Sequence, residues 1–220
     1  TIKSIWLLIV VEANFQSWGS HMIDHNTLLQ VAQTAGAEST EEFSFPARLA
    51  KFLGIPDGLH PRVIASIRAQ LPSGLYAHQV KAIVAGLAGR SVCVATPTAS
   101  GKTLIFTSIT ISRLLTSPGS VALALYPAKA LLHDQVSKWE AAAKGEGIQV
   151  GVIDGGVPVN QRTEILTRCK IILMTPDVMH AWMMAKLDVP EVRKFIGSLE
   201  VLVLDEAHIY DGIFGTNMAY

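Results

Sequence analysis

The chain contains 220 residues, of which half are hydrophobic and 16% are charged. Its 18 Lys and Arg residues are balanced by 18 Asp and Glu residues, so it has no bulk positive charge with which to bind a nucleic acid. The length indicates one domain with additional segments, and the hydrophobic content allows a sizeable buried core without disulfides or metals. We therefore expect any contact with nucleic acid to be local and to involve few groups.

The two cysteines, Cys93 and Cys169, fall at or beside predicted buried strands and have no CxxC spacing. This pattern is typical of reduced core thiols in an intracellular, cytoplasmic protein and argues against a cysteine-bound metal. The apolar run at residues 5–11 is too short to cross a membrane and has no signal-peptide cleavage site after it. We therefore expect no membrane partner.

The first 74 residues precede the main domain. Residues 19–22 read Gly-Ser-His-Met, which resembles the remnant of a cleaved expression tag, so we exclude residues 1–21 from the fold as tag-related residues, with the origin of residues 1–18 left open. Residues 22–74 form a predicted helical segment, with apolar residues at helical spacing in residues 26–33, 46–53 and 60–71. Pro72-Ser73-Gly74 ends this segment. It either packs against the main domain or binds a protein partner, and the sequence leaves both open.

Residues 75–220 show a different pattern, in which apolar strands alternate with helices. Strands are predicted at residues 92–96, 121–126, 149–153, 170–174 and 199–204, and helices at residues 103–115, 129–143, 161–167 and 178–186. Nearly continuous apolar strands separated by helices predict an α/β fold, in which a parallel sheet carries helices on both faces.

A phosphate-binding loop is predicted where the strand at residues 92–96 meets the next helix. Gly101-Lys102-Thr103 matches the end of the general phosphate-loop motif, and backbone N–H groups at a helix start favour anions. Lys102 is expected to contact the β- and γ-phosphates of ATP, and the Thr103 hydroxyl to bind Mg²⁺. The other loop residues expected to bind ATP are Thr98, Ala99, Ser100 and Gly101.

A second motif follows the strand at residues 199–204. Its apolar residues lead to Asp205 and Glu206 at the carboxyl end of the strand, where ligands of open α/β sheets bind. Asp205 is expected to hold the Mg²⁺ shell, and Glu206 to orient and deprotonate the attacking water. Together the two motifs predict ATP hydrolysis.

These residues resemble the motifs of superfamily 2 helicases of the DEAH type, and the resemblance extends from residue 75 to residue 220. It implies that this part of the chain is the first RecA-like lobe of such a motor. Leu75-Tyr76-Ala77-His78-Gln79 is similar to the glutamine motif of helicases, in which Gln79 would bind the edge of adenine. The resemblance also implies that His208 couples the ATP site to the nucleic-acid site.

Three further segments resemble the turns with which these helicases contact nucleic acid. They are Pro127-Ala128-Lys129, Gly155-Gly156 after Asp154, and Thr175-Pro176-Asp177. The resemblance implies that backbone N–H groups, together with Lys129, contact the phosphates of the bound strand. Such contacts carry no sequence information, so binding should tolerate any base sequence.

The segments at residues 126–135 and 205–219 are most similar to the group that contains the Hrq and MrfA helicases, which act in DNA repair, and to related bacterial defence helicases. Two residues depart from the family pattern. Ala99 replaces a glycine that is common in helicase loops, and Asp211 stands where the group often has a basic or polar residue. The Ser-Ala-Thr motif and the second lobe, with its arginine fingers, are expected outside this chain, so the chain alone should be nearly inactive.

We therefore interpret the chain as the motor lobe of an ATP-dependent DNA helicase or translocase that uses ATP and Mg²⁺. Two alternatives stay open. One is an RNA helicase or a translocase on duplex DNA, and the other is a nucleotide-dependent scaffold that binds a partner through residues 22–74. The intact set of Lys102, Thr103, Asp205 and Glu206 favours the motor.

Histidines and tryptophans outside these motifs are interpreted as structural. His78, His133 and His180 lack metal-ligand spacing and are expected to be surface or core residues. Trp139 and Trp182 fall on predicted helices and are expected to pack in the core rather than stack on bases.

Overall fold

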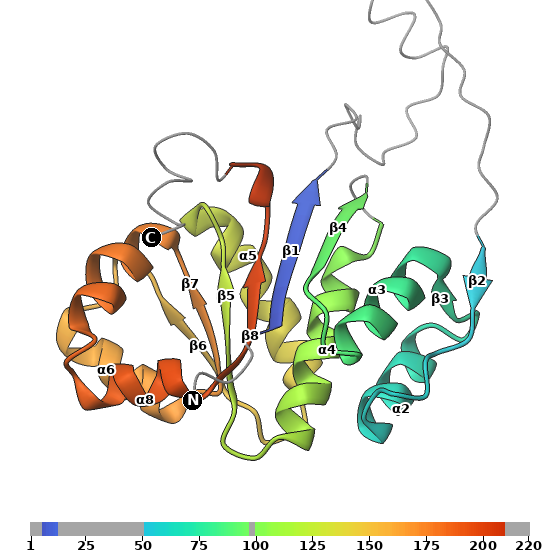
Figure 1. The fold of residues 1–220 in the computed structure, drawn as a ribbon, viewed down its shortest axis with the longest axis horizontal. Coiled ribbons are helices and arrows are strands. Elements are labelled where there is room, and N and C mark those ends of the chain that lie inside the picture. The colour runs from blue at the N-terminus through green and yellow to red at the C-terminus, as the bar shows by residue number, and fades with distance from the viewer. Residues whose placement is uncertain (1–5, 13–50, 97–99, 210–220) are drawn as a thin grey trace, which may run out of the picture.

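The computed structural model describes residues 6–12, 51–96 and 100–209. Six strands form one sheet in the order β4-β1-β8-β5-β7-β6, and every neighbouring pair is parallel. The predicted α/β fold is therefore confirmed (Figure 1). The strands are β1 (Trp6–Glu12), β4 (Val92–Thr96), β5 (Val121–Leu125), β6 (Val150–Ile153), β7 (Ile171–Met174) and β8 (Leu199–Leu204).

Helices cover both faces of this sheet. Along β5, Ala122 and Ala124 belong to one core cluster, and Leu123 and Leu125 to the other, because successive side chains of a strand point to opposite faces. The first cluster includes residues of α2 (Pro61–Gln70), α3 (Ala77–Leu87), α4 (Lys102–Thr116) and α5 (Lys129–Ala143). The second includes residues of α6 (Val159–Arg168), α7 (Pro176–Val178), the π-helix η1 (Met179–Met183) and α8 (Pro190–Gly197). Two 3₁₀ turns complete the described helices, η2 (Met184–Lys186) and η3 (Ala207–Ile209).

The position of β1 differs from the sequence expectation. Residues 1–21 were excluded from the fold, yet Trp6–Glu12 lies between β4 and β8 and pairs with both. A short run of Leu, Ile and Val suits a strand that has neighbours on both sides. The interpretation of residues 1–21 as tag-related stays a prediction.

The segment before the main domain is helical only in part. The expected helix at residues 60–71 is α2, which begins at Pro61 and is capped by His60, whose Nδ1 accepts a hydrogen bond from the Arg62 N–H at 3.4 Å. The expected helix at residues 46–53 is wrong at its end, because β2 (Phe52–Leu53) pairs antiparallel with β3 (Leu75–Tyr76). The expected helix at residues 26–33 lies outside the described residues.

The tryptophan expectation is confirmed. Trp139 is fully buried, and Trp182 is 7% exposed. The indole Nε1–H of Trp139 donates to the Tyr126 Oη at 2.8 Å, and its ring lies 5.4 Å from that of Phe106 on α4. None of the helices in the described ranges is both long and apolar enough to cross a membrane.

Candidate functional site

The predicted phosphate loop joins the end of β4 to the start of α4. Gly101 has a φ of 78°, in the left-handed region, and α4 begins at the next residue, Lys102. L side chains rarely adopt this φ, and a Cβ at position 101 would also press against the Gln79 side-chain amide, so glycine is strongly favoured there. Thr98 and Ala99, also expected in the loop, lie outside the described residues.

The polar groups of the loop bond to one another in this structure. The Lys102 ammonium donates to the Thr96 carbonyl oxygen at 3.0 Å, and the hydroxyls of Thr96 and Ser100 are 2.6 Å apart. Thr103 lies in the first turn of α4 and is half-buried. A cation and a helix start therefore meet at one point, an arrangement that favours a phosphate group.

Asp205 and Glu206 follow β8 at the same edge of the sheet. β1 separates β8 from β4, so the ends of these two strands are about 10 Å apart, given a strand spacing of about 4.8 Å. Asp205 is 7% exposed, and its backbone N–H donates to the Leu125 carbonyl at 3.1 Å. The structure thus brings the predicted loop and the predicted acidic pair to one side of the molecule.

Glu206 has an unusual backbone. Its φ is 50°, and among the described residues it is the one non-glycine residue with a positive φ. Its N–H donates to the Asp205 Oδ1 at 3.0 Å, which holds this turn. Such a conformation costs about 1–3 kcal/mol, and strain of this kind concentrates at functional sites. His208, the remaining residue of this motif, lies in η3, and its side chain is outside what the structure describes.

Gln79 lies against the phosphate loop and is 3% exposed. Its Oε1 accepts from the Tyr76 N–H at 2.9 Å, and its Nε2 donates to the Gly101 carbonyl at 3.2 Å. The predicted neighbour of adenine is thus engaged with the loop backbone, and binding a base edge requires it to exchange one of these partners.

Sequence reasoning missed an aromatic stack beside Gln79. The rings of Phe52 and Tyr76 are 5.0 Å apart, and those of Tyr76 and His78 are 5.7 Å apart and nearly parallel. The His78 Nε2 lies 3.0 Å from the Ser100 carbonyl, which ties the stack to the loop. Phe52 and Tyr76 are 46% and 38% exposed, so they offer an aromatic surface next to the phosphate site. The Tyr and His of the glutamine motif were visible in the sequence, but their distant partner Phe52 gave no signal.

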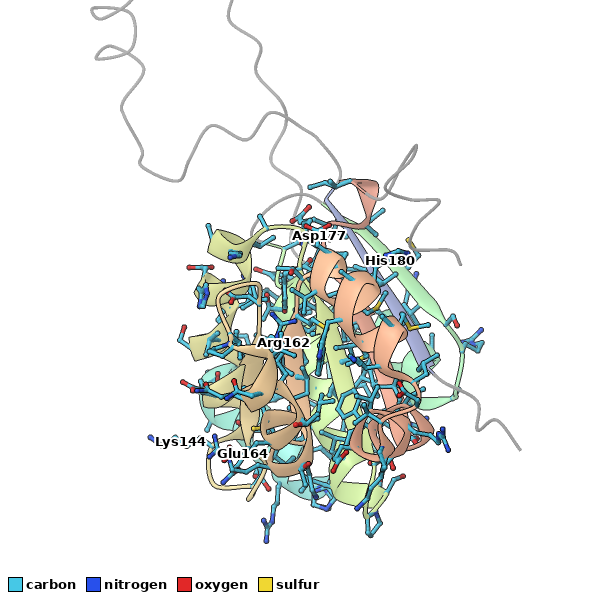
Figure 2. The ribbon with its side chains drawn as sticks, turned by 90° about the vertical axis from the view of Figure 1, so that its left-hand side faces the viewer. Lys144, Arg162, Glu164, Asp177 and His180 are labelled. Carbon is cyan, nitrogen blue, oxygen red and sulfur yellow. The ribbon has the colours of Figure 1, made fainter. Side chains whose placement is uncertain are left out.

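The expected nucleic-acid residues follow β5, β6 and β7, whose carboxyl ends lie at one edge (Figure 1). Figure 2 shows Asp177 near this edge, at the opposite end of the molecule from Lys144 and Glu164. Thr175 and Pro176 are buried, whereas Pro127 is half-buried. The remaining five are exposed, namely Ala128, Lys129, Gly155, Gly156 and Asp177.

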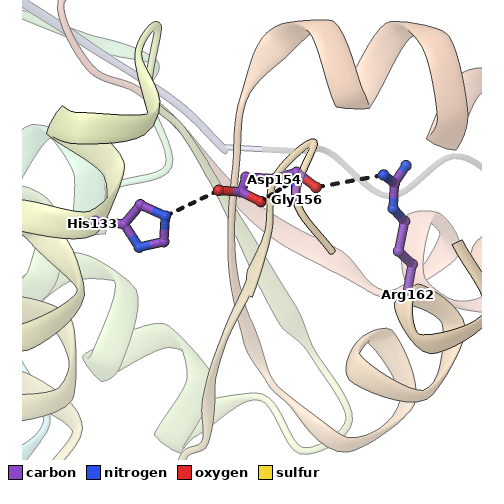
Figure 3. Close-up of polar contacts among 4 residues, drawn as sticks. All are labelled: His133, Asp154, Gly156 and Arg162. Carbon is purple, nitrogen blue, oxygen red and sulfur yellow. Dashed lines mark hydrogen bonds and ion pairs between the residues drawn. The ribbon is translucent and has the colours of Figure 1, made fainter. Parts of the chain in front are cut away.

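A polar network surrounds the second of these turns (Figure 3). The His133 Nε2 lies 3.0 Å from the Asp154 Oδ2, and the Gly156 N–H donates to the Asp154 Oδ1 at 2.7 Å. Burial would raise the pKa of Asp154, but the hydrogen bonds from His133 and Gly156 and the charge of Lys129 outweigh it and lower the pKa. The carboxylate is therefore ionised at neutral pH.

The expectations about metal ligands and cysteines concern residues away from this sheet edge. Within the described ranges, no group of three His, Cys, Asp or Glu side chains is arranged to hold a metal ion. Both cysteines are free, with Cys169 buried and Cys93 exposed on β4. The exposure of Cys93 contradicts its expected place in the core, because successive side chains of a strand point to opposite faces and Val92 and Val94 take the buried face.

Comparison with known proteins gives consistent matches. A family model described as "DEAD/DEAH box helicase" matches residues 76–220. The ATP-dependent helicase HRQ1 of Saccharomyces cerevisiae is 31% identical over 181 residues, which cover 80% of this chain and 16% of that protein. An uncharacterized ATP-dependent helicase, YprA of Bacillus subtilis, is 30% identical over 177 residues, which cover 78% of this chain and 23% of that protein.

A solved structure is also similar. The crystal structure of the DUF1998 helicase MrfA bound to DNA and AMPPNP matches with a TM-score of 0.75 and 27% identity, covering 86% of this chain and 27% of that one. This chain spans less than a quarter of the length of the two curated relatives.

Proposed function

Because this chain belongs to the DEAD/DEAH box helicase family, we propose that it is the ATP-binding lobe of a helicase or translocase that moves on DNA. The observation that carries the proposal is the shared sheet edge, where the phosphate loop, the acidic pair and the exposed turns after β5 and β6 all lie. DNA is favoured as the track because MrfA, of similar fold, is bound to DNA. A role in DNA repair or bacterial defence belongs to the same proposal.

In this proposal the phosphates of ATP bind at the start of α4. Lys102 leaves the Thr96 carbonyl, which it contacts at 3.0 Å, and donates to the β- and γ-phosphates instead. This exchange is favourable because a hydrogen bond between two charged groups is stronger than one to a neutral carbonyl. Gln79 binds the edge of adenine, beside the aromatic stack of Phe52, Tyr76 and His78. Glu206 orients the attacking water and accepts its proton.

Thr103 and Asp205 are the residues proposed to hold Mg²⁺. The hydroxyl and carboxylate oxygens of these two residues suit this cation, and Asp205, which is 7% exposed, lies at the sheet edge that holds the loop. When bound, Mg²⁺ would neutralise charge on the phosphate oxygens. Hydrolysis at a useful rate is proposed to need a second lobe that closes over this edge and supplies an arginine, a contribution of about 10³–10⁵ in rate.

Lys102→Ala tests the nucleotide site. Removing the ammonium should weaken Mg·ATP binding by about 1.5–3 kcal/mol, or about 10- to 150-fold in Kd, because a charge-assisted hydrogen bond is lost. Isothermal calorimetry on the chain measures this Kd. The matched control is Lys138→Ala, since Lys138 is an exposed lysine on α5 whose ammonium bonds to Asp134 at 3.0 Å. Equal affinities for wild type and Lys102→Ala would overturn the proposed site.

A further inference from the structure

Two of the exposed turns come from strands that are not neighbours in the sheet. Pro127–Lys129 follows β5 and Asp154–Gly156 follows β6, and β7 lies between these strands. The ends of β5 and β6 are thus about 10 Å apart at a strand spacing of about 4.8 Å. Helix α5, which connects the two strands, bridges this distance at its first turns.

The bridge consists of two side chains on one face of α5. Lys129 and His133 are four residues apart, so they lie one turn from each other. A Cβ placed on Gly155 would be 3.3 Å from the Lys129 Nζ, which shows that the ammonium stands beside this glycine. One turn further along, His133 reaches the Asp154 carboxylate at 3.0 Å.

The Asp154 carboxylate connects His133 to the backbone of the turn. One carboxylate oxygen bonds to His133 and the other accepts the Gly156 N–H at 2.7 Å (Figure 3). The Asp154 side chain is 10% exposed, whereas the His133 side chain is 59% exposed. A surface histidine is therefore attached to a nearly buried carboxylate that shapes the turn.

Arg162 holds the same turn from the opposite side. Its Nε donates to the Val157 carbonyl at 2.9 Å, and its Nη2 to the Asp154 carbonyl at 3.5 Å. The guanidinium is itself packed 5.3 Å from the centre of the Trp182 ring, and Arg162 is 8% exposed. Both the backbone and the side chain of Asp154 are thus fixed, while the two glycines after it remain exposed.

We propose that His133 is a positioning residue for the nucleic-acid contact. Through Asp154 it fixes the Gly155–Gly156 turn beside Lys129, so that the turns after β5 and β6 contact the phosphates of one strand as a single unit. Lys129 and Gly155 are both exposed and lie side by side. An ammonium beside an exposed backbone suits a phosphate group and makes no base-specific contact. The nucleic-acid part rests on the proposed function, but the positioning is a property of the free protein.

His133→Ala, His133→Gln and Ser137→Ala test this inference. Alanine removes the bond to Asp154, and glutamine keeps an N–H donor near the position of Nε2. Ser137 is exposed one turn further along α5 and controls for changes to the helix itself. Three quantities are measured on each: hydrogen exchange of the Gly156 amide, the Kd for an oligothymidine by fluorescence anisotropy, and the Kd for Mg·ATP by calorimetry.

In the alanine variant we expect faster exchange at Gly156 and about two- to five-fold weaker DNA binding, the range for the loss of one exposed polar contact. The Kd for ATP should not change, the glutamine variant should restore both altered values, and Ser137→Ala should match wild type.

Unchanged Gly156 exchange in His133→Ala would overturn the inference regardless of DNA binding. Faster exchange with unchanged DNA affinity would also overturn it, while a loss of affinity in Lys129→Ala would leave the proposed function standing. A wild-type chain that does not bind the oligothymidine would overturn both the proposed function and the nucleic-acid part of the inference.

Discussion

Tyr126→Phe should destabilise the protein although it deletes a single oxygen atom. The Tyr126 Oη accepts the Trp139 Nε1–H at 2.8 Å, and both side chains are fully buried. Phenylalanine keeps the ring but leaves a buried indole N–H without this acceptor, which costs about 1–3 kcal/mol. With an m-value of about 3 kcal/mol/M, the urea midpoint should fall by about 0.3–1 M.

Urea unfolding followed by far-UV circular dichroism measures this shift. Tyr76→Phe is the matched control, because the Tyr76 side chain is 38% exposed and its ring contacts are kept. A second arm makes Tyr126→Phe in a Trp139→Phe background, where no indole N–H remains, and there the cost should be much smaller. Equal costs in the two backgrounds, or equal shifts for Tyr126→Phe and Tyr76→Phe, would refute the hydrogen-bond argument.

Three other predictions concern charge and pairing. Two or three phosphate contacts predict a log–log salt slope of about −1.4 to −2.1 for single-stranded DNA, and Lys129→Ala should reduce its magnitude by about 0.7, whereas Lys138→Ala should not. The lowered pKa of Asp154 means that its ionised form stabilises the fold above about pH 4. The stability difference between wild type and Asp154→Asn should therefore shrink as the pH falls from about 5 to about 3, and an unchanged difference over that range would contradict this. Ile9→Pro should destabilise by about 3 kcal/mol or more, because β1 pairs with both β4 and β8 and proline removes an N–H from a central strand; an unchanged melting temperature would show that β1 is dispensable.

Much of the sheet could be predicted because its strands are short apolar runs bounded by turn residues. The strands at residues 92–96 and 199–204 were predicted with their final bounds, and the helix at residues 129–143 likewise. Strand order could not be predicted, since it depends on pairings between segments far apart in the chain. The place of β1 was missed for that reason, and because a tag-like sequence follows it.

Helix α8 was missed because its apolar signal is weak. In α8 the buried residues are Val192 and Phe195, three positions apart among charged neighbours, although Pro190 at its first turn was a usable sign. The helix expected at residues 178–186 is real, but it passes from α- through π- to 3₁₀-geometry, a change that periodicity does not reveal.

Sequence motifs identified the residues of the site, but not the hydrogen-bond partners that these residues have in the folded structure. The positions of Gly101, Lys102 and Asp205 follow from strand–loop–helix patterns, and they lie where the patterns indicated. The contact between His133 and Asp154 spans 21 positions and two elements, so only folding brings the pair together. His133 was interpreted as a structural surface or core residue, and its tie to a predicted nucleic-acid turn could not be inferred from spacing.

The location of Trp139 makes its intrinsic fluorescence a probe of changes between the phosphate loop and the exposed turns. Its indole contacts Phe106, one turn after Lys102 on α4, and bonds to Tyr126, the residue before the first exposed turn. Emission from a buried indole responds to small changes in packing and hydrogen bonding. With Trp6, Trp18 and Trp182 replaced by phenylalanine, position 139 carries the sole remaining tryptophan. Stopped-flow fluorescence of that variant would then time, without any attached dye, how quickly a change at the phosphate loop reaches the helix beside the turns proposed to contact DNA.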